Sequence, residues 1–422
     1  MSTSRTLLLL CTLLCGAVGA AHAQSGGSTY SMLGIGDLRY MPGARSAGMG
    51  YTGIGLSSSL YINPTAPATW TRINRTRVDA SVLFEGFNST DGHSSRYLSE
   101  TDFGGALMAI PISPLDGIVM VGGFTPYSNV DFNVVTKGSY GSGADQIDYK
   151  LAHVGTGGLG QAEIGLSWAP SEQWAVGASL NYVFGTIDKV TTMTSINTSI
   201  ATGVMTETNY MHGVLANVGV LYSGFTGGLA PLSIGANITT PGILHSVRDK
   251  KFVYSGGGQS GTSFDTLHLA EGTITIPVGL GFGLSWALND RLIFAADYRL
   301  QAWGYSDFYG QTPEGLRNSQ MAGIGFERAP SRDPSASFLN HLAYRLGFTF
   351  DATYYEVKGV PINEWTATGG LSLPVTGDTR LNLSAEYGVR GKQSSSLVKD
   401  TVLRFNVSLT LGEMWFVRPE ED

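Results

Sequence analysis

A strict alternation of apolar and polar residues is the feature that most constrains this chain. From Gln161 to Trp168 and from Trp174 to Phe184, apolar side chains occupy every second position, and the polar run 170–173 separates the two stretches. A period of two residues predicts two antiparallel strands, each with one apolar and one polar face. Trp168 and Trp174 lie on the apolar faces beside the turn. This placement is typical of the aromatic girdle of a membrane β-barrel, and a soluble sheet with a buried apolar face is the alternative.

Composition favours the membrane barrel. Charged residues make up 14% of the 422 residues, well below the roughly 25% of soluble domains. Hydrophobic residues make up 42%, but no apolar run approaches the roughly 18 residues that a membrane helix needs. The strands of a barrel are only half apolar. A barrel therefore accounts both for the low share of charged residues and for the absence of a long apolar run. The net charge of −7 argues against nucleic acid as a partner.

Residues 1–23 predict a secretory signal peptide that is cleaved. Arg5 provides the charged start, Leu7–Val18 the apolar stretch, and an Ala-His-Ala sequence the small-residue cleavage site. Both cysteines, Cys11 and Cys15, lie inside this signal. The mature chain therefore has no disulfide framework, no thiol catalysis and no cysteine metal site.

Residues 24–72 carry no sustained alternation and are rich in small side chains, above all in the run 43–55. Small residues let backbones approach closely, so this segment is suited to thread through a confined space. We predict an N-terminal hatch in the lumen, with a flexible linker as the alternative. Asn63 and Pro64, near its end, are the predicted hatch or gate residues, because the asparagine side chain and the fixed proline φ brace a turn.

The barrel domain is predicted over residues 73–413, and residues 414–422 are predicted to form an acidic periplasmic tail. Fourteen candidate strands follow the hatch, near 75–88, 97–111, 117–135, 158–169, 174–187, 205–224, 232–247, 268–287, 291–306, 318–328, 341–355, 363–374, 380–391 and 399–412. Short turns alternate with long polar loops, which are expected near 136–157, 188–204, 248–267 and 307–317. Short periplasmic turns and long external loops are the layout of bacterial outer-membrane barrels, and an even strand count puts both ends in the periplasm.

The polar faces of these strands predict the lining of the lumen, with charged side chains at Glu163, Asp297, Arg299, Arg345, Glu386, Arg390 and Arg404. Buried charges of both signs need to pair, so we expect a network that fills and stiffens the barrel, with an ion path as the alternative. The strand near 268–287 has Gly279, Gly281 and Gly283 on its inward face. We expect the hatch to lie close against this wall.

The third predicted strand is interrupted at Gly122, Gly123 and Pro126. A closed barrel has no edge that tolerates a proline, so Pro126 predicts a bulge or a gap in the hydrogen-bond ladder. We predict a lateral opening at these three residues. A bulge that only adjusts curvature is the alternative, and Pro277 on the eighth strand is a second break.

Several stretches resemble the long-chain fatty-acid transporter (FadL-like) family of outer-membrane barrels, which includes hydrocarbon channels. Residues 48–64 resemble its small-residue hatch, although Thr65 stands where Ala is usual after Asn-Pro. Residues 297–308, 276–277 and 387–391 are also similar to family motifs. The resemblance spans most of the mature chain. It implies a fourteen-stranded barrel with an N-terminal hatch that passes hydrophobic molecules and releases them sideways at the third strand.

The sequence therefore predicts a channel in the bacterial outer membrane for passive uptake of hydrophobic compounds, long-chain fatty acids or similar. The alternative is a non-conducting barrel that serves as a subunit or cargo adaptor of a secretion or assembly system. Expected partners are hydrophobic small molecules, outer-membrane lipids and the barrel-assembly machinery. No enzyme activity, cofactor or metal is expected: the G-x-G-x-x-G run 155–160 leads into a strand and not a helix, and the histidines lack ligand spacing.

Overall fold

The computed structural model describes residues 24–40, 43–92, 94–141, 146–196, 202–255, 263–331, 333–394 and 397–413. The predicted signal peptide and the predicted acidic tail lie outside these ranges. Within them, no helix is long and apolar enough to cross a membrane.

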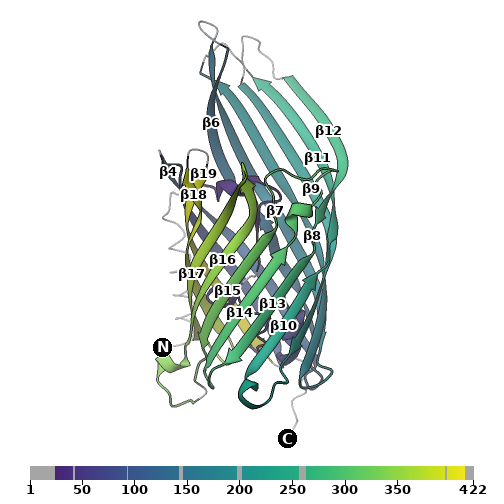
Figure 1. Cartoon of the computed structure of the whole chain (residues 1–422), viewed down its shortest axis with the longest axis vertical. Coiled ribbons are helices and arrows are strands. Elements are labelled where there is room, and N and C mark those ends of the chain that lie inside the picture. The colour runs from purple at the N-terminus through teal and green to yellow at the C-terminus, as the bar shows by residue number, and fades with distance from the viewer. Residues whose placement is uncertain are drawn as a thin grey trace.

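The strands form a closed antiparallel barrel (Figure 1), as predicted. Of nineteen strand segments, two belong to the N-terminal segment and three barrel strands are each split in two, so the barrel has 14 strands. β19 pairs with β3 from Lys399 and Thr90 to Glu413 and Thr76, and this ladder closes the cylinder. In chain order the barrel strands are β3 (Thr76–Thr90), β4 (Ser95–Ser113), β5 (Ile118–Asn129) with β6 (Phe132–Tyr140), β7 (Ile147–Trp168), β8 (Trp174–Ser195), β9 (Thr202–Tyr222), β10 (Leu232–Thr239) with β11 (Gly242–Ser255), β12 (Ser263–Ile276) with β13 (Gly279–Ala287), β14 (Leu292–Gln301), β15 (Ser319–Arg328), β16 (Ala343–Val357), β17 (Val360–Pro374), β18 (Arg380–Ser394) and β19 (Leu397–Glu413).

Two of the three splits coincide with prolines. β10 ends two residues before Pro241, and β12 ends immediately before Pro277. Proline has no N–H group to donate and interrupts the ladder of a paired strand. The predicted break at Pro277 is therefore confirmed. The third split, between β5 and β6, lies in the wall of the barrel beside the N-terminal segment.

Each predicted strand coincides with a barrel strand or a split pair, but the prediction of long loops at 136–157, 188–204 and 248–267 is wrong for most of their residues. β7 and β8 each have 22 residues, whereas a strand needs about 9–11 to cross a bilayer. The strands β6, β7, β8, β9, β11 and β12 continue well past the others at the top of Figure 1. We call this extension the tall panel. Its sequence lacks the apolar alternation that marks a membrane strand, as expected where a strand continues beyond the bilayer.

The predicted inside and outside faces agree with the structure. On β7 and β8, Ile164, Leu180 and Trp174 are outward and 60%, 57% and 48% exposed. The ring of Trp174 lies 4.6 Å from that of Tyr222 on β9, next to the short turns. Apolar side chains that are this exposed around a closed barrel belong against lipid, with aromatic residues at the interface.

Leu180→Arg tests this assignment. The control is Thr194→Arg, which lies on the same outward face of the same strand but in the tall panel. A cation costs about 2–4 kcal/mol near the bilayer midplane and about 0–1 kcal/mol near or beyond the interface. We expect Leu180→Arg to lower the yield of folded barrel, measured by heat-modifiable gel migration, and Thr194→Arg to leave it unchanged. Equal yields would contradict the assignment of faces and depth.

Candidate functional site

Residues 24–40 and 43–73, together called the lumen segment below, lie inside the barrel and supply much of its buried core. Met49, Ile54 and Trp70 are at most 2% exposed. The last helix of the segment contacts β7, β8 and β9. The segment therefore occupies space that the barrel strands do not fill. Its elements are β1 (Gln24–Ser25), η2 (Thr29–Met32), β2 (Asp37–Leu38), α2 (Ala44–Ala47) and η3 (Pro67–Arg72).

The backbone of the lumen segment rests directly on inward-facing glycines of the wall. A β-carbon added to Gly235 of β10 would lie 2.2 Å from the Ile54 carbonyl oxygen. One added to Gly323 of β15 would lie 2.2 Å from the Gly50 carbonyl oxygen, and one on Gly347 of β16 would lie 2.2 Å from the Gly50 nitrogen. No real β-carbon approaches so closely. Glycine is therefore the residue that permits this backbone-to-backbone packing.

The expected contact at the glycines of β13 is confirmed for two of the three. A β-carbon on Gly281 would lie 2.7 Å from the Ile54 side chain, and one on Gly283 would lie 2.7 Å from the Gly55 nitrogen. At Gly279 the nearest atoms belong to the wall itself, at 3.5 Å or more. The lumen segment therefore crosses β13 at its second and third glycines.

Asn63 fixes the turn at the end of the small-residue run. It does so through side-chain hydrogen bonds, as predicted for an asparagine at this position. Its amide oxygen accepts hydrogen bonds from the backbone nitrogen and the hydroxyl of Thr65, both at 3.0 Å. Its amide nitrogen donates to the Gly53 carbonyl at 3.0 Å, and its own carbonyl accepts from the Trp70 indole at 2.6 Å. Asn63 thus ties together three parts of the lumen segment.

A carboxylate shared by two arginines attaches the helix α2 to the wall. Glu327 of β15 lies 3.0 Å from Arg45 of the helix and 2.6 Å from Arg345 of β16. Arg345 also donates to the Tyr61 hydroxyl at 2.9 Å. Arg345 and Glu327 are almost fully buried, and a buried charge needs such partners.

Asp297 of β14 holds the lumen segment through its backbone. One carboxylate oxygen accepts from the backbone nitrogens of Gly53 at 2.8 Å and Ile54 at 2.9 Å. The same oxygen lies 3.0 Å from Arg299, which also donates to the Tyr51 carbonyl at 2.9 Å. Asp297 and Arg299, both predicted to line the lumen, thus bind the same turn of the lumen segment.

A larger network joins the start of the lumen segment to β3, β17, β18 and β19. Arg390 lies 2.8 Å from Asp37 of β2 and 2.6 Å from Glu364. Arg404 lies 2.6 Å from Glu364 and 2.5 Å from Glu85. Charge-assisted contacts of this kind are the strong ones when they are buried and mutual. The expected pairing of lumen charges is therefore present here.

The two remaining predicted lumen residues differ from each other. The Tyr51 hydroxyl donates to both oxygens of Glu386 at 3.0 Å, and Arg404 lies 3.8 Å away. Glu163 of β7 is buried in register with Asn181 of β8, and none of the ion pairs described includes it. Glu386 therefore belongs to the network and Glu163 does not.

The ion pairs also include charged residues that were not predicted from the sequence, among them Asp37, Arg39 (paired with Glu85), Arg45, Glu85, Glu327 and Glu364. Glu85, Glu327 and Glu364 each stand beside an outward aromatic residue, so the period of two could have assigned them to the lumen. Asp37 and Arg39 lie in a segment without a period. No signal in the sequence marks them.

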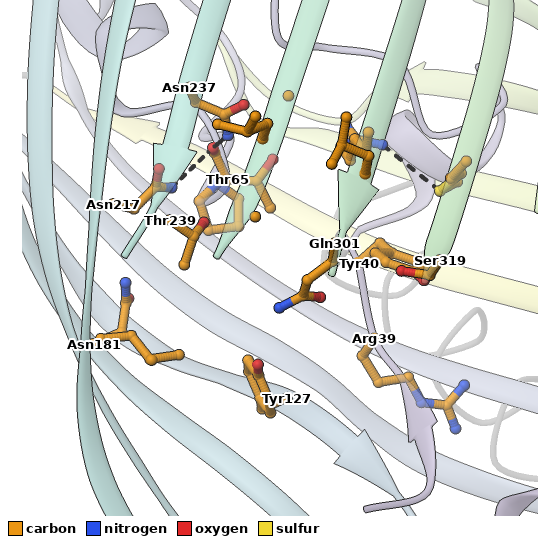
Figure 2. A pocket seen from close by; sticks show the side chains of 18 of the residues that line it. Arg39, Tyr40, Thr65, Tyr127, Asn181, Asn217, Asn237, Thr239, Gln301 and Ser319 are labelled. Carbon is orange, nitrogen blue, oxygen red and sulfur yellow. Dashed lines mark hydrogen bonds between the residues drawn. The ribbon is translucent and has the colours of Figure 1, made fainter. Parts of the chain in front are cut away.

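The lumen retains a cavity of about 140 Å³ beside the lumen segment, which we call the amide cavity (Figure 2). Asn181, Asn217 and Asn237 reach it from three successive strands, and the last two donate to the Thr65 carbonyl. The side-chain oxygens of Asn217 and Asn237 are buried and have no hydrogen-bond partner among the described residues. A cavity of this size with unpaired polar atoms is suited to ordered water.

Two smaller cavities adjoin the amide cavity. The ionic cavity, about 90 Å³, is lined by charged residues of the network and shares Arg39, Tyr40 and Met321 with the amide cavity. The small cavity, about 30 Å³, shares Pro64 with it. The predicted gate residue Pro64 therefore stands between two cavities, and its neighbour Asn63 lines the small one.

The wall of the barrel is incomplete where the third strand is split. β4 pairs with β5 only from Ser113 to Ala106, and β6 pairs with β7 alone among the described residues. The lumen segment fills this gap. β1 runs parallel to β4 at residues 98–99, Gly27 donates to the Asp131 carbonyl at 3.1 Å, and β2 pairs with β5. We call this junction the seam.

The three residues of the predicted lateral opening do not stand together at the seam. Gly122 and Gly123 pair with both β4 and β7, so the ladder is intact there. Pairing with β4 ends at Phe124, and the register with β7 shifts between Pro126 and Ser128. The bulge predicted at Pro126 is confirmed, and this residue borders the seam.

A closed barrel with an apolar outer surface and a chain segment in its lumen is the fold of FadL-type barrels. The toluene transporter TodX of Pseudomonas putida is similar, with a TM-score of 0.58 and 16% identity over 89% of this chain and 99% of that one. The Ralstonia pickettii toluene transporter TbuX has a TM-score of 0.55 and 16% identity over 87% and 97%. A Pseudomonas aeruginosa FadL homologue has a TM-score of 0.57 and 12% identity over 89% and 99%. The likeness confirms the expected fold.

The amino-acid sequence assigns the chain to a particular family. The BamG family model matches residues 4–420, nearly the whole chain, and the protein belongs to the BamG family. The comparison with curated protein sequences gives no match.

Gly235→Ala tests the packing of the lumen segment on the wall. The added carbon meets the Ile54 carbonyl, and overpacking of this kind costs about 1–3 kcal/mol. We expect the barrel to lose its compact gel migration at a lower temperature than the unchanged protein. Gly228→Ala is the matched control, since nothing lies within 4 Å of a carbon added there. An equal response of both variants would contradict the contact.

Proposed function

We propose that this protein is a barrel with a closed lumen that serves as a subunit of the barrel-assembly machinery in the outer membrane. The observation that carries the proposal is the attachment of the lumen segment to the wall. Buried ion pairs hold it at Asp37, Arg39 and Arg45, and Asp297 holds its backbone further along, at Gly53 and Ile54. Such a segment stiffens the barrel and occupies much of its lumen. The family name, BamG, agrees with a role in barrel assembly.

The character of the cavities also supports a closed barrel. Pockets for drug-sized molecules measure about 300–1,000 Å³, and the amide cavity measures about 140 Å³. An apolar cavity of about 150 Å³ accepts benzene, but this one is lined by amides. A hydrocarbon would leave the oxygens of Asn217 and Asn237 without water, at about 1–3 kcal/mol for each group.

Purification of the tagged full-length protein from outer membranes in mild detergent tests the proposal. We expect components of the barrel-assembly machinery to co-purify at constant ratio, and depletion of the protein to reduce the amount of folded outer-membrane barrels. The Leu180→Arg variant, which is expected to fold poorly, is the control for depletion. A purely monomeric protein whose loss leaves other barrels at normal levels would contradict the role.

A second candidate function is passage of hydrophobic compounds with lateral release at the third strand. The observation in its favour is the fold, which the chain shares with proteins described as toluene transporters, together with the split wall at the seam. In this reading Pro126 keeps the ladder open, and Gly122 and Gly123 give the strand its freedom to bend. Asn63 and Pro64 are the gate in the lumen.

Pro126→Thr separates the two candidates. Threonine restores a backbone N–H group, and transport through the seam predicts a slower uptake of labelled toluene or labelled fatty acid by cells that carry the variant. If uptake is the same with and without the protein, the transport function is excluded and the assembly role is unaffected. Gly123 is unsuitable for this test, because a β-carbon there would lie 2.2 Å from the Ala106 carbonyl oxygen.

A further inference from the structure

The apolar outer surface of the barrel is hollowed by a groove, which we call the outer groove. Its volume is about 710 Å³, and it crosses β9, β10, β13 and β14, low on the barrel in Figure 1. Ile234, Phe282 and Tyr298 line it and belong to the exposed apolar side chains of the outward face. The described residues that line the outer groove differ from those that line the three lumen cavities. The outer groove therefore opens outwards, into the membrane.

Small residues form the floor of the outer groove. In the ladder, Ala236 of β10 is paired with Phe282 of β13, and Ala296 of β14 is paired with Leu284 of β13. An alanine beside such a large side chain leaves a hollow at its own position. The floor reaches the backbone at Gly235, whose inner side carries the lumen segment. The wall is one backbone layer thick here, and its floor has no side chain that could turn to close the hollow.

The outer groove runs from the level of the short turns towards the middle of the membrane. Trp174 is the first residue of β8 and Tyr222 is the last residue of β9, and both line the groove beside these turns. At the other end, Tyr298 lies six residues beyond Leu292, where β14 begins. A rise of about 3.3 Å per residue and a strand tilt of about 40° put Tyr298 roughly 15 Å above the turns. The hydrocarbon core is about 30 Å thick, so the groove spans about one leaflet.

The two ends of the outer groove differ in polarity. At the end near the turns, the rings of Trp174 and Tyr222 lie 4.6 Å apart, and Phe225 packs edge-on against Tyr222 at 4.9 Å. Indole and phenol groups favour the level of the lipid headgroups, where the ring is in hydrocarbon and the polar tip can form hydrogen bonds. At the far end, the Tyr298 hydroxyl already donates to Gln320 at 2.9 Å. The groove thus has polar groups at the membrane surface and an apolar lining below them.

We propose that the outer groove is a binding site for one phospholipid of the periplasmic leaflet. One acyl chain lies in the groove, and the headgroup lies at Trp174 and Tyr222. Short turns are on the periplasmic side of an outer-membrane barrel, which assigns the leaflet. An amphiphile matches the polarity of the groove from end to end. The gain is van der Waals contact of a flexible chain with an irregular apolar surface, since the surrounding lipid is as apolar as the groove.

Ala236→Leu combined with Ala296→Leu fills the floor of the outer groove and tests the proposal. The full-length protein is purified in mild detergent, checked for heat-modifiable migration and examined by native mass spectrometry for retained phospholipid. We expect the unchanged protein to retain one phospholipid molecule. We expect the double variant to retain about tenfold less, equivalent to about 1.4 kcal/mol of binding free energy.

Ala367→Leu combined with Ala385→Leu is the matched control. Both alanines lie on the exposed outer face, on β17 and β18, and do not line the outer groove. We expect this variant to retain the lipid. Equal retention by the two double variants, or an unchanged protein without retained phospholipid, overturns the proposal. A filled variant that keeps its lipid but loses a co-purifying protein also overturns it, because the groove would then be a protein contact.

Crosslinking of the unchanged protein in phosphatidylcholine vesicles gives a second test that needs no variant to fold. The vesicles carry a phosphatidylcholine with a photoreactive diazirine, either at the end of one acyl chain or beside the glycerol. The chain-end probe is expected to label peptides with Phe282 and Tyr298, and the glycerol probe those with Trp174 and Tyr222. Labelling spread evenly around the barrel, or in the reverse order, contradicts the proposal. The measurement uses the isolated protein, so its outcome is independent of co-purification with the assembly machinery.

Discussion

The filling of the lumen is the constraint on which the rest of this structure depends. A barrel of about eight strands fills its interior with side chains, and one of 16–18 strands leaves an aqueous channel. With 14 strands this barrel lies between these cases and needs additional chain inside. The lumen segment meets that need because its backbone rests on bare glycine positions such as Gly235 and Gly323. Side chains on either partner would hold the two backbones several ångströms further apart.

Electrostatics then fixes where the segment lies. The wall brings Arg345, Arg390 and Arg404 into a space of low dielectric together with several carboxylates. Wall charges pair with one another, as Arg345 does with Glu327, and the segment supplies further partners of both signs, a carboxylate from Asp37 and a guanidinium from Arg39. Steric fit and charge balance therefore select the same position of the chain. The lumen segment is therefore an integral part of the buried core of the barrel.

Much of the fold could be predicted because lipid acts as the outer solvent. Lipid requires an apolar residue at every second position, and this pattern predicted the fourteen strands and their faces. Pro126 and Pro277 interrupt the pattern and were therefore predicted as breaks. The same signal disappears in the tall panel, where strands such as β7 continue in water, so those residues were predicted as loops. The seam was not predicted either. β1 and β2 have two residues each, too few to carry a period, and their partners lie far away in the chain.

The tall panel has a consequence for how the molecule meets other chains. Closure removes the edges of a sheet only where the cylinder is complete, and β6 continues beyond the seam with a partner on one side only among the described strands. The free edge of a strand presents backbone N–H and C=O groups to a further strand. Natural edge strands are often shielded by charge, and here Lys137 is the one charged residue on β6. The panel is in effect an open sheet, on which an extended segment of another protein can add as the next strand.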